Sequence, residues 1–187
     1  MNKKKYTIAQ ILPALNTGGV ERGVIEISKA LSDNGFNSIV ISSGGHMVPQ
    51  LRRSGTKHYE INVHSKNLLK WPQIRKQVKL ILEKEDVDLI HICSRAPAWI
   101  IFPLGKVLGV PVVTSVHMRF RKTNLFKKYY NSILTKGDKV IAISKHIEKT
   151  IKESFPQPSI KNKITVIHRG DDLELCNYDN SKPAIII

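Results

Sequence analysis

The chain has 187 residues, 41% of them hydrophobic, which is enough for one well-buried α/β domain and too little for two full ones. Its 30 Lys and Arg against 15 Asp and Glu give a net charge of +15, which favours an anionic partner: nucleic acid, phospholipid, a phosphorylated substrate or a nucleotide. The two cysteines form no disulfide or metal-binding pattern, and no apolar run is long enough for a membrane-spanning helix.

Short stretches rich in β-branched residues recur along the chain and alternate with helical patterns. The apolar periodicity predicts helices over 20–31, ending near Gly35, over 71–81, over the almost wholly apolar 97–108, and over 145–153 after the N-cap Ser144. Residues 155–163 contain two prolines and predict a turn-rich connection. Strands are predicted at 7–12, 36–42, 58–62, 87–92, 110–116, 138–144 and 164–168. This alternation predicts an α/β fold with a doubly wound parallel sheet.

Ligands of doubly wound sheets bind beyond the carboxyl ends of the strands, so the loops after the strands are the candidate sites. The first loop contains Gly18 and Gly19 just before a helix, where free backbone N–H groups can receive a phosphate. An ordinary tight turn explains the same two glycines. The loop after 87–92 contains Ser94, a candidate helix cap, and Arg95, a candidate anion ligand. An arginine that satisfies local carbonyls is an equal alternative, and His91 is interpreted as a packed core residue.

Two further loops carry candidate residues. His117 follows the predicted strand 110–116, where an imidazole can accept a proton or hydrogen-bond a sugar hydroxyl. A purely structural histidine is the alternative. Arg169 follows the last predicted strand and can reach a phosphate, unless it lies in a solvated turn.

The positive charge is concentrated in the second half of the chain. Residues 117–170 contain 13 Lys and Arg against 3 Asp and Glu. Phenylalanines and tyrosines are interleaved with the basic residues Arg119, Arg121, Lys122, Lys127 and Lys128. This combination fits an anionic membrane surface or single-stranded nucleic acid, and a solvated helix face is the alternative. Because the chain has no nucleic-acid recognition motif, nucleic acid is the less favoured partner.

Six segments in order resemble family 4 glycosyltransferases: LPALNTGGVERGVIEISKALSDNG, ISSGG, LIHICSRAPAW, VVTSVH, KYYNSILTKGDKVIAISKHI and ITVIHRGDDLE. The likeness runs from about residue 7 to the end of the chain. The SRAPAW and KYYNSILTKGDKVIAIS stretches are most similar to bacterial enzymes that build lipopolysaccharide. The resemblance implies a Rossmann-like domain, one half of a GT-B fold, that binds the acceptor in a retaining sugar transfer.

The resemblance also implies roles for individual residues. Gly18 and Gly19 would approach the diphosphate and sugar of the donor. His117 would orient groups or handle a proton in the cleft. The acceptor or phosphate side would be lined by Ser94, Arg95 and Arg169. The family's usual Gly-Val-Asp turn is replaced by Gly170-Asp171-Asp172.

Residues 179–182 predict a polar linker and 184–187 a buried strand. We therefore expect the acceptor-binding domain to span 1–178, and 179–187 to form the linker and first strand of a nucleotide-sugar-binding domain that is otherwise missing. The expected partners are a nucleotide-sugar, a lipid-linked glycan acceptor, an anionic membrane on its cytoplasmic face and a separately encoded carboxyl-terminal half. No cofactor or metal is expected. Alone, the chain would be inactive; the alternative is a non-catalytic remnant or binding subunit.

Overall fold

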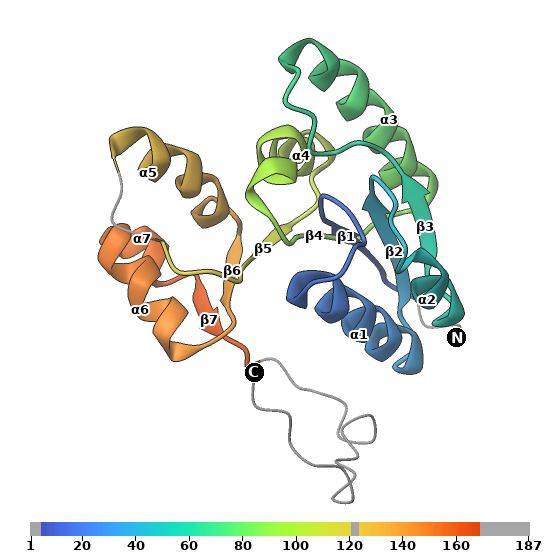
Figure 1. The fold of residues 1–187 in the computed structure, drawn as a ribbon, viewed down its shortest axis with the longest axis horizontal. Helices are drawn as coiled ribbons and strands as arrows, with labels where there is room; N and C mark the ends of the chain where they lie inside the picture. Colours follow the sequence, from blue (N-terminus) through green and yellow to red (C-terminus); the bar gives the residue numbers. More distant parts are fainter. Residues whose placement is uncertain (1–4, 121–123, 169–187) are drawn as a thin grey trace, which may run out of the picture.

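The computed structural model describes residues 5–120 and 124–168, which form a seven-stranded parallel sheet with helices on its faces (Figure 1). The strand order is β3-β2-β1-β4-β5-β6-β7. The strands are β1 (Thr7–Ile11), β2 (Asn37–Ser42), β3 (Lys57–Glu60), β4 (Leu89–Ile92), β5 (Val112–Val116), β6 (Lys139–Ala142) and β7 (Ile164–Val166). All seven predicted strands are confirmed, and so is the predicted α/β, doubly wound fold class.

The helices connect consecutive strands. They are α1 (Gly19–Asp33), α2 (Val48–Arg53), η1 (Leu68–Lys70), α3 (Trp71–Lys84), α4 (Arg95–Leu108), α5 (Leu125–Ser132), η2 (Ile133–Thr135), α6 (Lys145–Ser154) and α7 (Pro158–Lys161). Two helix ends follow the sequence prediction in detail. Gly35 adopts φ 80° just after α1, and the Ser144 hydroxyl accepts a hydrogen bond from the Ile147 N–H at the start of α6.

The turn-rich connection predicted for 155–163 also contains one helical turn. Pro158 begins α7, where its missing N–H has no helical partner to lose. The almost wholly apolar composition of 97–108 favours a buried helix, and Ile100, Ile101 and Leu104 are buried, but Val107 is 67% exposed. Near its carboxyl end α4 therefore has one face open to solvent.

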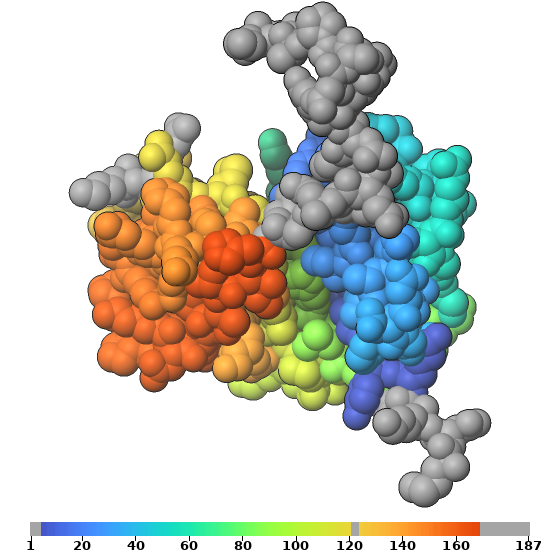
Figure 2. Space-filling model, turned by 90° about the horizontal axis from the view of Figure 1, so that it is seen from below, coloured from blue at the N-terminus to red at the C-terminus, as the bar shows by residue number. Residues whose placement is uncertain are grey.

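Each face of the sheet has its own core. The larger core packs α3, α4 and α6 against one face through residues such as Val78, Ile101 and Ile151. The smaller core packs α1 and α2 against the other face through Val24 and Leu51. In Figure 1, α1 accordingly lies on the opposite side of the strands from α3 and α4. Figure 2 shows α1 in blue and the α6–β7 segment in orange and red, separated by residues from the middle of the chain.

The loop after β2 holds the glycine-bearing loop after β1 in place. Gly44 accepts a 2.7 Å hydrogen bond from the Leu15 N–H, and the Ser43 hydroxyl donates to the Pro13 carbonyl at 2.7 Å. Gly45 has φ 138°, and a Cβ there would collide with the Leu15 carbonyl. Glycine is therefore required at 45 both for its backbone conformation and for the close approach of the two loops.

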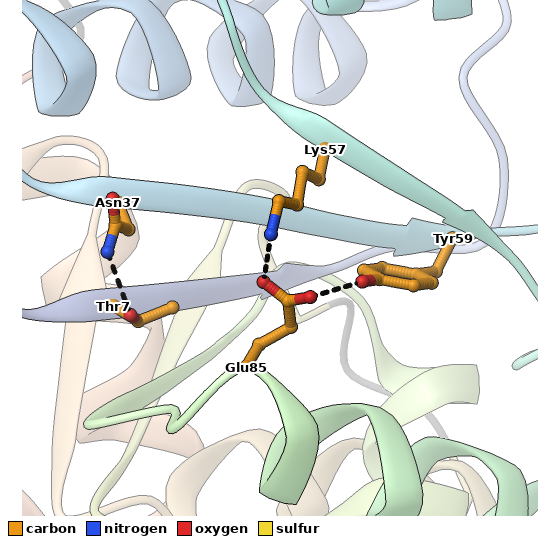
Figure 3. Close-up of polar contacts among 5 residues, drawn as sticks. All are labelled: Thr7, Asn37, Lys57, Tyr59 and Glu85. Carbon is orange, nitrogen blue, oxygen red and sulfur yellow. Dashed lines mark hydrogen bonds and ion pairs between the residues drawn. The ribbon is translucent and has the colours of Figure 1, made fainter.

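The edge strand β3 is tied to the end of α3 by the Glu85 carboxylate (Figure 3). This carboxylate accepts hydrogen bonds from Lys57 Nζ at 2.7 Å and from the Tyr59 hydroxyl at 2.5 Å. The two hydrogen bonds lower the pKa of Glu85, and the bond to Glu85 together with burial raises the pKa of Tyr59 to about 12. Figure 3 also shows Asn37 of β2 donating to the Thr7 hydroxyl of β1 at 3.4 Å.

We predict that Glu85→Gln lowers the free energy of unfolding by ~1–2 kcal/mol near neutral pH, because two hydrogen bonds lose their charged acceptor. Since the folded-state pKa of Glu85 is depressed, its contribution is present above the unfolded pKa and is lost as the pH falls through the folded pKa. Urea unfolding at several pH values measures both effects.

The matched control is Glu83→Gln, which removes an exposed i,i+4 pair with Lys79 in the same helix and should change stability by less than ~0.5 kcal/mol. Equal effects of the two substitutions at neutral pH would contradict the role assigned to Glu85.

Candidate active-site pocket at the carboxyl ends of the strands

The sheet reverses its winding between β1 and β4. From β1 the chain proceeds to β2 and β3 on one side, and from β4 to β5, β6 and β7 on the other. Ile11 pairs with Ile92 in the parallel register, and the Cys93 N–H donates to the Ile11 carbonyl at 2.9 Å. The loops after these two strands therefore diverge at the same edge, which is where doubly wound sheets bind ligands.

A pocket of about 100 Å³ lies at this edge. It brings together three predicted site residues, Ser94, Arg95 and His117, from the loops after β4 and β5. The other residues that line it are Val20, Cys93, Ser115, Val116, Met118, Phe120 and Leu134. Loops that follow different strands meet at this one pocket, which is the geometry expected of a binding site.

His117 follows the last residue of β5 and is half-buried at the pocket. Beneath it lies a second imidazole, that of His91, which is buried and placed 2.6 Å from the Ser115 hydroxyl through Nε2. Burial, and secondarily the charge of His117, lowers the pKa of His91 to about 4. His91 is therefore neutral near pH 7, and its interpretation as a core histidine is confirmed.

Cys93 also lines the pocket but is not suited to nucleophilic chemistry. Its side chain is 4% exposed, and burial raises the pKa of its thiol to about 12. Because the thiolate is the reactive form, Cys93 stays protonated and inert at neutral pH.

Arg95 is held by α5 rather than by local carbonyls. Its guanidinium donates a 2.8 Å hydrogen bond to the Asn131 side chain and lies 5.9 Å from the centroid of the Tyr130 ring. Trp99, one turn further along α4, stacks with Tyr130 and donates its indole N–H to the Tyr130 carbonyl at 3.1 Å. These contacts fix the direction of Arg95 at the pocket wall.

Ser94 occupies the N-cap position of α4, as predicted, but its side chain makes no capping hydrogen bond. The prediction that its hydroxyl caps the helix was therefore wrong. The extended backbone at Ser94 places it at the pocket instead.

Gly18 and Gly19 form the start of α1 and do not line the pocket themselves, although the next residue, Val20, does. Gly18 is the N-cap and has an extended backbone. The Glu21 carboxylate folds back so closely that a Cβ at Gly18 would collide with it. A phosphate at this helix start would have to displace that carboxylate, since the two anions repel each other.

Several predicted residues lie elsewhere. Arg119, Lys127 and Lys128 are exposed, on the segment after β5 and on α5. Arg169, Arg121 and Lys122 lie outside the described residues, as does the boundary expected at 178. Two residues of the site, Asn131 and Ser115, were not predicted from the sequence, because no local pattern shows that each contacts a side chain from a distant segment.

Comparison with known proteins shows the family of this chain. The Glycosyltransferase Family 4 model matches residues 17–175, most of the chain. The chain belongs to glycosyltransferase family 4. The resemblance predicted from the six sequence segments is therefore confirmed.

The family 4 chain is similar to several known proteins. A glycosyltransferase from Rickettsia africae has a crystal structure that is 38% identical, with a TM-score of 0.80 over 96% of this chain and 48% of that chain. The Anabaena protein HepE, solved in complex with UDP and glucose, is 16% identical with a TM-score of 0.75 over 93% of this chain and 47% of that chain. The fold is thus of the GT-B type.

A curated relative extends the comparison to archaea. An uncharacterised glycosyltransferase of Methanocaldococcus jannaschii is 26% identical over 148 residues, 76% of this chain and 36% of the relative. The family 4 chain therefore spans about half the length of the solved structures and about a third of this relative.

No helix within residues 5–120 and 124–168 is long and apolar enough to span a bilayer.

We predict that His91→Gln makes the free energy of unfolding less dependent on pH below about pH 6.5. The unfolded imidazole takes up a proton below its usual pKa of about 6.5, whereas the folded one resists protonation down to about pH 4. The folded state of the unmodified chain therefore loses up to ~1.4 kcal/mol per pH unit over this window as the pH falls. Glutamine keeps a polar atom near Ser115 but does not titrate.

Urea unfolding between about pH 8 and about pH 4.5 tests this prediction. Any loss of packing shifts the profile equally at all pH values, so the measurement at the alkaline end serves as the internal control. If the free energies of unfolding of the unmodified chain and the His91→Gln variant fall in parallel as the pH is lowered, the assignment of a neutral buried His91 is contradicted.

Proposed function

We propose that this chain supplies the acceptor-binding half of a retaining glycosyltransferase, which moves a sugar from a nucleotide-sugar to lipopolysaccharide or a related envelope glycan. The observation that carries the proposal is the pocket of a family 4 domain in which His117, Ser94 and Arg95 meet. The acceptor class is supported by the likeness of SRAPAW and KYYNSILTKGDKVIAIS to lipopolysaccharide enzymes.

The proposed role of His117 is to orient an acceptor hydroxyl or handle its proton. The imidazole is half-buried at a pocket that also holds the anchored Arg95. Its buried neighbour His91 has a pKa lowered to about 4 and stays neutral near pH 7. Arg95 and Ser94 would bind polar or anionic groups of the acceptor beside His117.

Catalysis by this chain would depend on a second domain. Stabilisation of the departing nucleotide is a large part of such a reaction, and the family 4 chain spans only about half the length of its solved relatives. We propose that the donor is held mainly by that second domain, with the start of α1 at Gly18 and Gly19 and Arg169 approaching its phosphates. The chain alone would then be inactive.

We further propose that the basic residues around α5 place the domain on the anionic, cytoplasmic face of the membrane, where a lipid-linked acceptor is found. Arg119, Lys127 and Lys128 are exposed. Next to them the side chains of Leu125 and Phe126 are 85% and 78% exposed. Cations beside exposed apolar side chains suit the boundary between headgroups and acyl chains.

We predict no sugar transfer by the purified chain alone, and transfer when a donor-binding half is supplied with it, since neither half holds all the groups that the reaction needs. The assay is nucleotide-sugar turnover with lipopolysaccharide from a truncated-core strain as acceptor. In the reconstituted enzyme, His117→Ala should lower turnover by at least ~100-fold.

The matched control is His146→Ala on the exposed side of α6, which should leave turnover unchanged. Turnover by the chain alone would overturn the half-enzyme proposal. Absence of turnover with the second half would instead favour a binding protein that keeps the acceptor pocket.

For the membrane, we predict that the chain sediments with phosphatidylglycerol vesicles and not with neutral phosphatidylcholine vesicles. Because each lysine or arginine near an anionic surface contributes about 1 kcal/mol, Arg119→Gln combined with Lys127→Gln should weaken partitioning by ~30-fold. Lys145→Gln combined with Lys149→Gln removes the same charge from α6 and serves as the control. Equal recovery with both kinds of vesicle would refute the membrane proposal.

A further inference from the structure

A second and larger pocket lies beside the candidate active site and shares no lining residue with it. Its volume is about 600 Å³, within the usual range for small-molecule sites. It is an open pocket lined by residues of α4, α5, η2 and the α6–α7 segment, on the sheet face that carries the larger core. No part of the family 4 chemistry described above uses it.

The charged residues that line this pocket are all cationic. Lys128 of α5, Lys136 after η2 and Lys163 before β7 all line it, and none of the residues that line it is acidic. Elsewhere in the described part of the chain, ion pairs with carboxylates are formed by Lys29, Lys57, Lys79 and Lys152. Lys136 Nζ also lies 5.7 Å from the centroid of the Trp99 ring, outside the pocket lining. Three lysines that line one pocket without a carboxylate favour an anionic ligand, and phosphate suits lysine well.

The rest of the lining is apolar and aromatic. Phe102 and Ile160 are half-buried, and Phe155 is 4% exposed beneath them. Lys128 Nζ lies 5.9 Å from the centroid of the Phe155 ring, which brings a cation and the apolar floor together. A ligand that satisfies both parts of the pocket has an anionic group and an apolar body.

The rim of the pocket distinguishes a membrane lipid from a soluble anion. Leu125 and Tyr129 line the pocket and their side chains are 85% and 61% exposed. A small soluble anion bound in the pocket would leave these apolar side chains exposed to water, whereas a bilayer would bury them. The rim and the lysines together therefore match the headgroup region of a membrane.

We propose that this pocket, defined as the lysine pocket by Lys128, Lys136 and Lys163, binds the phosphate of one anionic phospholipid, with the start of its acyl chains against Phe102 and Ile160. The proposal rests on the membrane contact proposed above and adds a specific site to it. It also places the lipid beside the candidate active site, because Phe155 packs edge-on against Phe120 of that site at 5.5 Å.

The test uses the full chain and dihexanoyl-phosphatidylglycerol below its critical micelle concentration, with binding followed by titration calorimetry. We expect saturable binding of one lipid. Lys136→Gln combined with Lys163→Gln should weaken it roughly tenfold or more, because charge-assisted contacts are lost. Ser159→Glu, which introduces a carboxylate at the exposed edge of the pocket, should also weaken it.

The control is again Lys145→Gln combined with Lys149→Gln, and circular dichroism verifies that every variant is folded. Unchanged lipid affinity in both pocket variants would overturn the lysine pocket, even if vesicle binding persists. Glycerol phosphate that binds as tightly as the short-chain lipid would overturn the assignment to a lipid. Vesicle binding can also depend on Arg119 and Lys127 but not on Lys136 and Lys163. That result would support the proposed membrane contact and refute only the specific lipid site in the lysine pocket.

Discussion

The parallel pairing of β1 with β4 is the constraint on which the arrangement of this domain depends. Because Ile11 and Ile92 lie side by side in register, the two loops that follow them leave the sheet at the same point and in opposite directions. A shift of one residue in this register would turn Ile92 away from the larger core and move Ser94 and Arg95 away from the pocket. The position of the candidate site thus follows from the packing of two short buried strands.

One side of the pocket is held in place because the buried polar groups beneath it hydrogen-bond to each other. The neutral His91 and the Ser115 hydroxyl form a buried pair under the loop that carries His117. On the other side, Arg95 is fixed by Asn131. A reacting group in this pocket would therefore meet positioned side chains and not flexible ones, which is the arrangement that catalysis by orientation requires.

Much of the fold was predictable because the strands are buried and rich in β-branched residues, as in VVTSV of β5. The helices α1, α3 and α6 were predictable from their caps and apolar spacing. The short helices α2 and α7 and the aromatic-rich α5 were not, because their stability comes from contacts with distant segments. His117 could be singled out by its place after a strand, whereas the hydrogen bond between Arg95 and Asn131 spans 36 residues and leaves no local pattern.

Helix α5 is attached to α4 by a few side-chain contacts and contributes little to the hydrophobic core. Within α5, Asn131 is the buried residue, and the helix is held mainly by the hydrogen bond to Arg95 and by the rings of Trp99, Tyr129 and Tyr130. Contacts of this kind bury little apolar surface area. Mutations on the outward side of α5 can therefore accumulate without unfolding the sheet, which gives evolution a region where the partner of the domain can change while its architecture stays the same.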